Sequence, residues 1–239
     1  METLAALVAA HGSVLVLDAA TTRMQAGLLR SGREPVWRMG GDNAGVHLFA
    51  AVRDCLAGSG LRPGGIGAYV FCDGPGGQLG IRTACMALRT WQVARTAPAP
   101  VFAYPSLRLA ALALVRTGTA TPFATIADAR RDCWHAVRVD SAGTVSSVLR
   151  VPAEEMRAWP EPLFAPEGFR AWSPPPRAPA ACPYDLAGLF AALADEPLLI
   201  PVAEPEPWTS LNIEYKVWTG ERHRGPAAGT PGGPHGQRR

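Results

Sequence analysis

The feature that most constrains the fold of this chain is a pattern that occurs twice: an apolar strand ending in aspartate, a turn, and two further strands. The first copy covers residues 13–39 and begins with SVLVLD, and the second covers residues 122–151 and begins with PFATIADARR. Short aliphatic runs separated by turn residues are typical of strands. A unit that repeats within one chain indicates a duplicated supersecondary structure. We therefore predict an α/β protein with two βββαβα-type subdomains, the second of them reduced.

The remaining sequence alternates between helical and strand patterns. Apolar residues at helical spacing predict helices at 45–57, 81–94 and 106–118. Apolar runs predict strands at 68–72 and 100–103. A proline-rich stretch, 159–183, is predicted to be irregular, and a short helix in YDLAGLFAALA and a strand in PLLIPV are predicted after it. The glycine- and proline-rich tail, 225–239, is predicted to be disordered, because it has no apolar periodicity with which to build a core.

Composition restricts the class of protein and its compartment. The net charge is only +3, and the positive side chains are scattered arginines with Lys216 as the one lysine, so no continuous basic stripe of a nucleic-acid binder is seen. The five cysteines form no CxxC pair, which favours a reducing cytosol over a zinc ribbon or a disulfide framework. The amino end lacks the basic region of a signal peptide, and no apolar run is long enough to cross a bilayer. We expect a cytoplasmic protein without a membrane association.

A glycine-rich stretch, DGPGGQLGIRTA (73–84), lies between a predicted strand and a predicted helix. Such turns often bind anions. Ile81 and Arg82 stand where a Walker A loop has its lysine, and the GxGxxG pattern of dinucleotide-binding loops is not satisfied. The glycines are therefore better explained by close packing of the loop against its surroundings than by phosphate chemistry.

The first strand of each repeat ends in an aspartate: Asp18 in LDAATT and Asp128 in IADARR. An aspartate in such a turn either holds the metal of a nucleotide, with the neighbouring Thr21 and Thr22 facing the phosphates, or simply caps the turn. The sequence leaves both interpretations open.

Four segments together resemble the TsaB (YeaZ) family. CDGPGGQLGIRTA is similar to its GRGPGSFTGLRIG hallmark, VLVLDAATTRMQAGLL to its opening strand pair, LFAAVRDCLAGSGLRPGGIGAYVF to its first helix and following strand, and IADARRDCWHAV to its IDAR strand pair. The likeness covers residues 13–140 well. It implies the actin-like ATPase (ASKHA, RNase H-like) fold, with an RNase H-like subdomain at 1–105 that holds the glycine loop and a reduced subdomain at 106–224.

The resemblance also implies a role and partners. Proteins of this family are non-catalytic platforms that pair with TsaD, the subunit that transfers a threonylcarbamoyl group to an adenosine of certain transfer RNAs, and work with the small ATPase TsaE. They touch the tRNA only indirectly and form homodimers when alone. TsaD-type proteins carry an HxxxH metal pair, and no two histidines of this chain are four residues apart. We therefore expect the partner subunit, with no metal and no catalytic residue of its own.

The loop and the first turn depart from the family pattern. Ala19 and Ala20 replace the Thr-Ser that follows the family's aspartate, and Gly77 to Leu79 replace its Ser-Phe-Thr, so the hydroxyls of both motifs are lost. A phosphate needs several converging donors. The residues left to face a nucleotide are Asp18, Thr21, Thr22, Gly74, Gly76, Gly77, Arg82 and Asp128, which allows at most weak ATP or ADP binding, at the partner interface. We expect no ATP turnover by the chain alone. A small kinase or ATPase of the same superfamily and a homodimeric interaction protein are the alternatives.

Two predicted helices are apolar on more than one face. A helix that is apolar over most of its circumference is buried on more than one side, and one sheet cannot cover both sides. The chain's own carboxyl-terminal half could supply the second cover. The resemblance implies instead that a partner does, and the predicted interface residues are Leu48, Ala51, Val52, Cys55, Met86, Ala87, Trp91 and Ala94.

Overall fold

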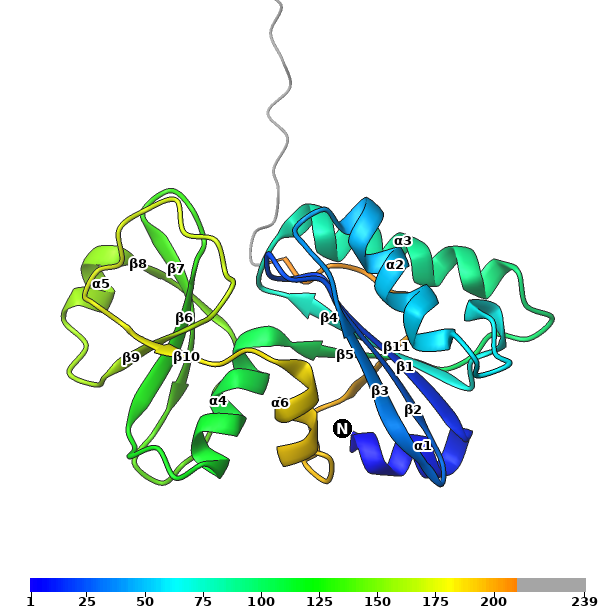
Figure 1. Cartoon of the computed structure of the whole chain (residues 1–239). Coiled ribbons are helices and arrows are strands. Elements are labelled where there is room, and N and C mark those ends of the chain that lie inside the picture. The colour runs from blue at the N-terminus through cyan, green and yellow to red at the C-terminus, as the bar shows by residue number, and fades with distance from the viewer. Residues whose placement is uncertain (210–239) are drawn as a thin grey trace, which may run out of the picture.

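A computed structural model describes residues 1–209 of the chain as two β-sheets with helices packed around them (Figure 1). The first half of the chain forms α1 (Leu4–His11), β1 (Ser13–Asp18), β2 (Gln25–Arg30), β3 (Arg33–Met39), α2 (Ala44–Leu56), a 3-10 turn η1 (Pro63–Gly65), β4 (Ala68–Gly74), α3 (Gln78–Val93) and β5 (Val101–Pro105). The second half forms α4 (Ser106–Arg116), β6 (Phe123–Asp128), β7 (Cys133–Val139), β8 (Leu149–Pro152), α5 (Ala153–Arg157), β9 (Leu163–Pro166), β10 (Ala180–Cys182), α6 (Leu186–Ala192) and β11 (Ile200–Val202).

The first sheet has the strand order β11-β5-β4-β1-β2-β3. The strands β1, β2 and β3 form an antiparallel meander, while β1, β4 and β5 run parallel. The helices α2 and α3 lie on one face of this sheet, and α1, α4 and α6 lie on the other (Figure 1). The strands β1 and β4 are buried along nearly their whole length, because helices cover both faces.

The second sheet has the strand order β10-β9-β6-β7-β8 and starts with the same antiparallel meander, β6-β7-β8. One of its faces packs against Met156 of α5 and against Trp159, which follows this helix, and the other packs against α4 through Leu107 and Ala111. The duplicated α/β architecture is confirmed, since each half opens with a βββ meander whose first strand ends in aspartate.

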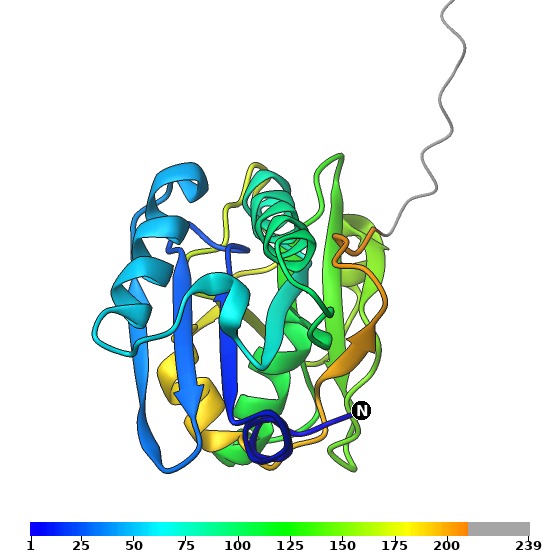
Figure 2. The ribbon, with the colours of Figure 1, turned by 90° about the vertical axis from the view of Figure 1, so that its right-hand side faces the viewer.

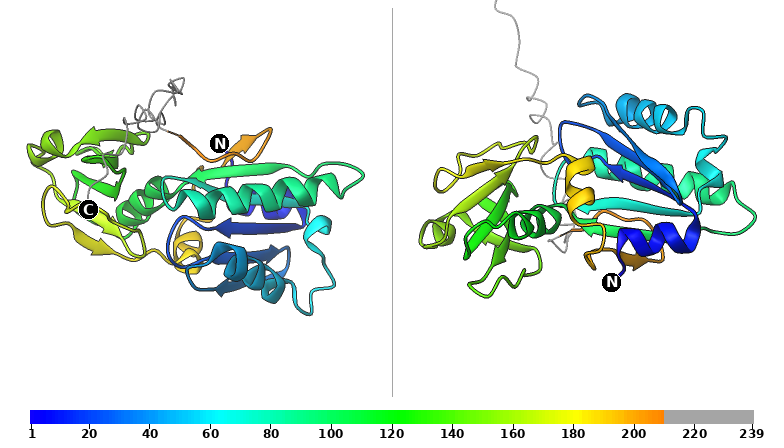
Figure 3. Two further views of the ribbon diagram at one scale, coloured as in Figure 1. Left: turned by 90° about the horizontal axis from the view of Figure 1, so that it is seen from above. Right: turned by 60° about the horizontal axis from the view of Figure 1, so that its bottom comes forward.

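The helix α4 joins the two sheets. Leu109, Ala110 and Ala113 belong to the core of the first sheet, whereas Leu107 and Ala111 belong to the core of the second. Figure 2, turned by 90° from Figure 1, shows the first sheet and its helices in front, and the two views of Figure 3 show α4 between the sheets. A helix that is apolar on two faces in this way fixes the two sheets relative to each other.

The chain returns to the first sheet after it has completed the second. The helix α6 contributes Phe190 to the first core, where its ring packs edge-on against Tyr104 and stacks on Trp37. The strand β11 then pairs with β5. No single point in the chain therefore separates the residues of one sheet from those of the other.

Some details differ from the sequence expectations. The stretch 159–183, expected to be irregular, contains the short strands β9 and β10, which pair in parallel with each other, and β9 also pairs in parallel with β6. Backbone pairing with a buried neighbouring strand stabilises strands whose own residues have little β propensity. The helix α1 was not expected, although Thr3 caps its N-terminus and Gly12, with a φ of +72°, ends it. The tail 225–239 lies outside the described residues.

The return of α6 to the first sheet leads to a prediction about stability. Replacing Phe190 by alanine should lower the free energy of unfolding by about 3 kcal/mol, because the ring is almost fully buried between two aromatic neighbours. The control is Phe49→Ala on α2, whose ring is 42% exposed and should cost under about 1 kcal/mol. Urea unfolding of both variants measures this, and equal losses would mean that α6 is not docked as described.

Candidate functional site

The first aspartate, Asp18, is a buried structural group. It is the last residue of β1 and has no exposed surface, and its side chain lies in the core. Its Oδ1 accepts a hydrogen bond from the Ala20 amide at 2.8 Å, and its Oδ2 accepts from the hydroxyls of Tyr104 at 2.7 Å and Tyr184 at 2.8 Å. Burial raises the pKa of this carboxyl, while the hydrogen bonds from Tyr104, Ala20 and Tyr184 oppose that rise. The expected role of Asp18 in facing a nucleotide is therefore wrong for this conformation, since its oxygens point into the core.

The second aspartate, Asp128, organises two loops. Its Oδ1 accepts from the Arg130 amide at 2.5 Å, and its Oδ2 accepts from the amides of Trp172 and Ser173, each at 2.7 Å. The carboxylate thus caps the β6–β7 turn and fastens the 172–173 segment beside it. Within residues 1–209, no three His, Cys, Asp or Glu side chains lie together in a way that could hold a metal ion.

The glycine loop between β4 and α3 packs tightly on the turn that follows β1. A Cβ atom at Gly76 would lie 2.5 Å from the Ala20 carbonyl oxygen, and one at Gly80 would lie 2.2 Å from that of Ala19. The Gly77 amide donates to Ala20 O at 2.7 Å. Contacts this short exclude any side chain. Glycine at these positions thus allows the loop to pack against the turn. This agrees with the sequence, which matches neither the Walker A pattern nor the GxGxxG pattern.

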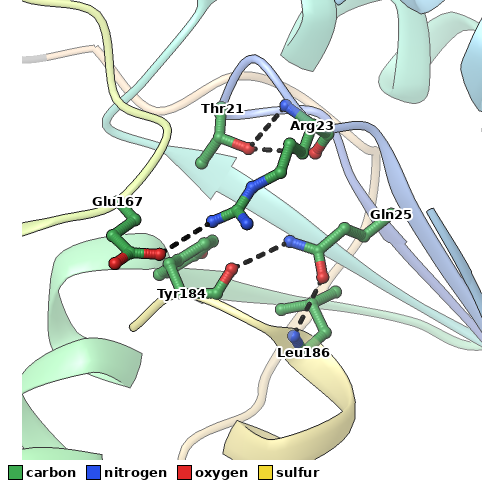
Figure 4. A network of polar contacts seen from close by, with 6 residues as sticks. All are labelled: Thr21, Arg23, Gln25, Glu167, Tyr184 and Leu186. Carbon is green, nitrogen blue, oxygen red and sulfur yellow. Dashed lines mark hydrogen bonds and ion pairs between the residues drawn. The ribbon is translucent and has the colours of Figure 1, made fainter. Parts of the chain in front are cut away.

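The threonines of the first turn serve the same region. The Thr21 hydroxyl accepts from the Arg23 amide and donates to the Arg23 carbonyl (Figure 4). The Thr22 amide donates to Gly168 O at 2.8 Å. In the same network Gln25 bonds to the backbone of Tyr184 and Leu186. These bonds fasten β2 to the returning chain, so both threonines are structural in this conformation. Gly74 is buried at the end of β4.

A cleft opens above this packed region, between the two sheets. Its larger cavity, of about 840 Å³, is lined by the turn after β1, the starts of α2 and α3, and Arg130, Arg170 and Trp172. A second cavity of about 260 Å³ shares Arg82, Arg130 and Trp172 with it and adds Asp128, His135, Arg150 and Trp208. Of the residues expected to face a nucleotide, only Thr21, Gly76, Gly77, Arg82 and Asp128 line these cavities. Sequence reasoning missed Arg130, Arg150 and Trp172, which come from the β6–β7 turn, from β8 and from the segment between β9 and β10.

A separate apolar surface lies over α2 and α3. Its exposed side chains are Val46 (58%), Phe49, Leu79 (80%), Met86 (57%) and Val93. Phe49, Leu79, Met86 and Trp91 line a groove of about 410 Å³ between the two helices. We call this the α2/α3 groove.

The predicted interface residues divide between this surface and the core. Met86 and Ala94 are exposed and Trp91 is half-buried, as an interface would need. Leu48, Ala51, Val52 and Cys55 are instead buried inside the protein, so they are not available to a partner, and Ala87 is also buried although it lines the groove. The apolar stripe of α2 was assigned to the wrong side: the stripe faces the sheet, and Val46 and Phe49 beside it face outward.

Asp73, just before the glycine loop, is a partly buried residue whose carboxyl has an unusual environment. Its Oδ1 has no hydrogen-bond partner among the described residues, and burial raises its pKa to about 7. A carboxyl with a raised pKa in the folded state binds its proton more tightly there than in the unfolded chain. Its stabilising contribution is complete below the unfolded pKa near 4 and is lost as the pH rises through about 7.

We predict that Asp73→Asn removes this pH dependence, because an amide has no proton to lose. The free energy of unfolding of the wild-type chain should fall relative to the variant between about pH 4 and pH 7. Urea titrations at a series of pH values measure the difference. A difference that stays constant over this range would mean that Asp73 titrates normally.

The packing of the glycine loop leads to a second prediction. Gly80→Ala should lower the free energy of unfolding by about 1–3 kcal/mol, since its new methyl group meets the Ala19 carbonyl. Gly45→Ala, in the first turn of α2, is the matched control: its nearest atom, Asn43 Oδ1, is 3.4 Å away. That change should raise stability by up to about 1 kcal/mol through helix propensity. Tolerance of alanine at Gly80 would show that the loop is not packed as described.

Comparisons with known proteins show which solved structures this architecture resembles. No family model and no curated protein sequence matches the chain. Among solved structures, YeaZ from Pseudomonas aeruginosa is similar with a TM-score of 0.57 and 26% identity, over 77% of this chain and 90% of that one. A second structure, an uncharacterised protein from Pseudomonas aeruginosa with similarity to peptidase YeaZ, is similar with a TM-score of 0.54 and 24% identity, over 78% of this chain and 97% of that one.

These structural matches agree with the four sequence segments and with the sheet order of the actin-like ATPase fold. No helix within residues 1–209 is both long and apolar enough to cross a membrane. This fold and these motifs in the expected order support the resemblance of the chain to the TsaB (YeaZ) family.

Proposed function

We propose that this chain is a non-catalytic platform subunit of the machinery that makes N6-threonylcarbamoyladenosine in tRNA. In this role it pairs with a TsaD-like catalytic subunit, works with a TsaE-like ATPase and acts in the cytoplasm. The single observation that carries the proposal is the α2/α3 groove. The groove exposes Phe49, Leu79 and Met86, and Val46 and Val93 are exposed on the same two helices; an apolar patch of this kind usually marks a protein interface.

The interior of the groove supports an interface with another protein over a small-molecule site. Met86 and Phe49 have flexible or large apolar side chains, which adapt well to a partner's surface. Arg82, Thr83 and Thr90 supply a polar margin around them. A hydrophobic centre with a polar rim is the usual anatomy of a protein interface. Helices of a partner could pack against α2 and α3 to form a bundle.

The alternative of a small kinase or ATPase is less well supported by the geometry. Such an enzyme needs carboxylates that hold the metal of its nucleotide and donors that face the phosphates. The oxygens of Asp18 are satisfied by two tyrosine hydroxyls and an amide, and those of Asp128 by three amides. An ATP site, if the complex has one, would then lie at the partner interface. The third candidate, a homodimeric interaction protein, would use the same groove.

We predict that Met86→Glu abolishes association through the α2/α3 groove while the chain stays folded. A charge at the centre of an apolar interface is left without a partner, which weakens binding by tenfold or more, about 1.4 kcal/mol at least. The measurement is size-exclusion chromatography with light scattering, on the chain alone and with the TsaD-like protein of the same genome. The conservative change Met86→Leu should retain association, and Leu149→Glu, on the second sheet, should have no effect.

The same chromatography measurements distinguish the two possible partners, a second copy of the chain and the TsaD-like protein. A homodimer of the isolated chain that disappears when the TsaD-like protein is added would show that both use one surface. A chain that remains monomeric and does not associate with the TsaD-like protein would overturn the proposed function. So would a Met86→Glu variant that still associates.

A further inference from the structure

Three arginines line the cleft between the sheets without a carboxylate partner. Arg82 comes from α3, Arg130 from the β6–β7 turn and Arg150 from β8, and all three line the 260 Å³ cavity. None of them forms an ion pair within residues 1–209. We call these residues, together with Trp172 and Trp208, the arginine cleft.

The acidic side chains near the arginine cleft are already engaged. Asp128 accepts from three backbone amides, and Asp42 pairs with Arg170 at the mouth of the larger cavity. His135, which also lines the smaller cavity, has a pKa lowered to about 4 by burial and by the charge of Arg150, so it adds no positive charge at neutral pH. Three arginines and one carboxylate, Asp128, line the smaller cavity, so its lining keeps a net positive charge, which favours an anionic ligand.

The backbone that carries Arg130 is strained. Arg130, Arg131 and Asp132 have φ values of 60°, 54° and 54°, the left-handed region that side chains with a Cβ rarely adopt. Asp128 and Cys133 hold this turn through hydrogen bonds to the backbone of Arg130. The result is that the Arg130 guanidinium lies over the Trp172 ring, 3.9 Å from its centroid. Strain that neighbouring groups maintain in this way is concentrated at functional sites.

Two indoles stand beside the arginines. Trp172 is 51% exposed, although it is one of the largest apolar side chains of the protein. Trp208 is fixed at the other side of the smaller cavity: its amide donates to Asp73 O at 2.9 Å, and its ring packs edge-on against His135. Exposed aromatic rings between arginines are the usual means of binding unpaired bases and their phosphates.

A single bound nucleotide fits this arrangement less well than a strand. Below the cleft, the glycine loop packs directly on Ala19 and Ala20, and Asp18 is buried, so no cradle for a chain of phosphates is left there. The charges lie instead on side chains from both sheets. Phosphates at successive positions of a polynucleotide would meet arginines that are separated in this way.

We propose that the arginine cleft binds single-stranded RNA, with phosphates at the arginines and an unpaired base against Trp172. The choice of RNA rests on the proposed function in tRNA modification. The family resemblance implied only indirect contact with the tRNA, and this proposal goes beyond that. The cleft is next to the α2/α3 groove, since Arg82 lines both. The chain would then hold RNA beside its catalytic partner.

The test is binding of a short, unstructured fluorescent oligoribonucleotide to the full chain, followed by fluorescence anisotropy. The double variant Arg130→Gln and Arg150→Gln should weaken binding by about tenfold or more and make its salt dependence less steep, by about 0.7 in the log–log slope for each lost contact. The matched control carries the same loss of charge at two distant exposed arginines, Arg53→Gln and Arg116→Gln, and should bind almost as the wild type does.

The base contact is tested separately. Trp172→Ala should weaken binding of the oligoribonucleotide by about tenfold, whereas a blunt RNA duplex, whose bases are stacked inside, should bind weakly to wild type and variant alike. ATP should compete only at concentrations far above those of the oligoribonucleotide. Circular dichroism and thermal unfolding confirm that each variant is folded.

Three outcomes would overturn the proposal: equal losses in the two double variants, tight binding of the duplex, or displacement of the RNA by ATP at similar concentrations. The last outcome would assign the cleft to a mononucleotide. Association with the TsaD-like protein, measured on the same variants, keeps the two proposals apart. The Arg130 and Arg150 variants should retain that association, and Met86→Glu should retain RNA binding by the isolated chain.

Discussion

The buried carboxyl of Asp18 is the group on which the rest of this structure depends. A carboxyl without exposed surface is costly unless its oxygens are hydrogen-bonded, and here Tyr104 and Tyr184 satisfy it together with the Ala20 amide. Tyr104 belongs to β5, and Tyr184 lies two residues before the start of α6. The three bonds thus fasten the first strand of the protein to the last strand of its parallel core and to the chain returning from the second sheet. The position of α6 on the first sheet follows from this junction.

The same junction determines where chemistry or binding can occur. The bond from the Ala20 amide draws the turn after β1 toward the core, and the glycine loop packs directly onto that turn. In an actin-like enzyme these two segments would hold the phosphates and the metal of a nucleotide. In this chain their polar groups are bonded to each other, as Gly77 N and Ala20 O are. The surfaces left for partners lie above them, in the arginine cleft, and beside them, in the α2/α3 groove.

The sequence predicted local elements well and long-range contacts poorly, for identifiable reasons. The strand at 13–18 and the helix that starts at 106 were predicted from local apolar patterns, which is the information that such patterns contain. The role of Asp18 was not predictable, because its two hydroxyl partners are 86 and 166 residues away. The outward face of α2 was misassigned, since a helix that is apolar all round does not reveal which stripe meets the sheet. The arginine cleft was missed because its residues are scattered along the chain and gather only when both sheets are in place.

Contacts across the cleft favour a fixed geometry over one that opens and closes. Enzymes that enclose a ligand need hinges between their lobes. In this chain α4 packs into the cores of both sheets. The loop after β9 is also connected to the turn after β1 and to the start of α2. These contacts are the hydrogen bond of the Thr22 amide, the Arg23–Glu167 ion pair and the Arg170–Asp42 ion pair. On the other side, Trp208 joins the end of β4 to His135 of β7. Each exposed ion pair contributes little alone, but contacts at both ends of the cleft resist the same motion. A constant distance between the groove and the arginine cleft is what a subunit needs if it is to present two partners to each other.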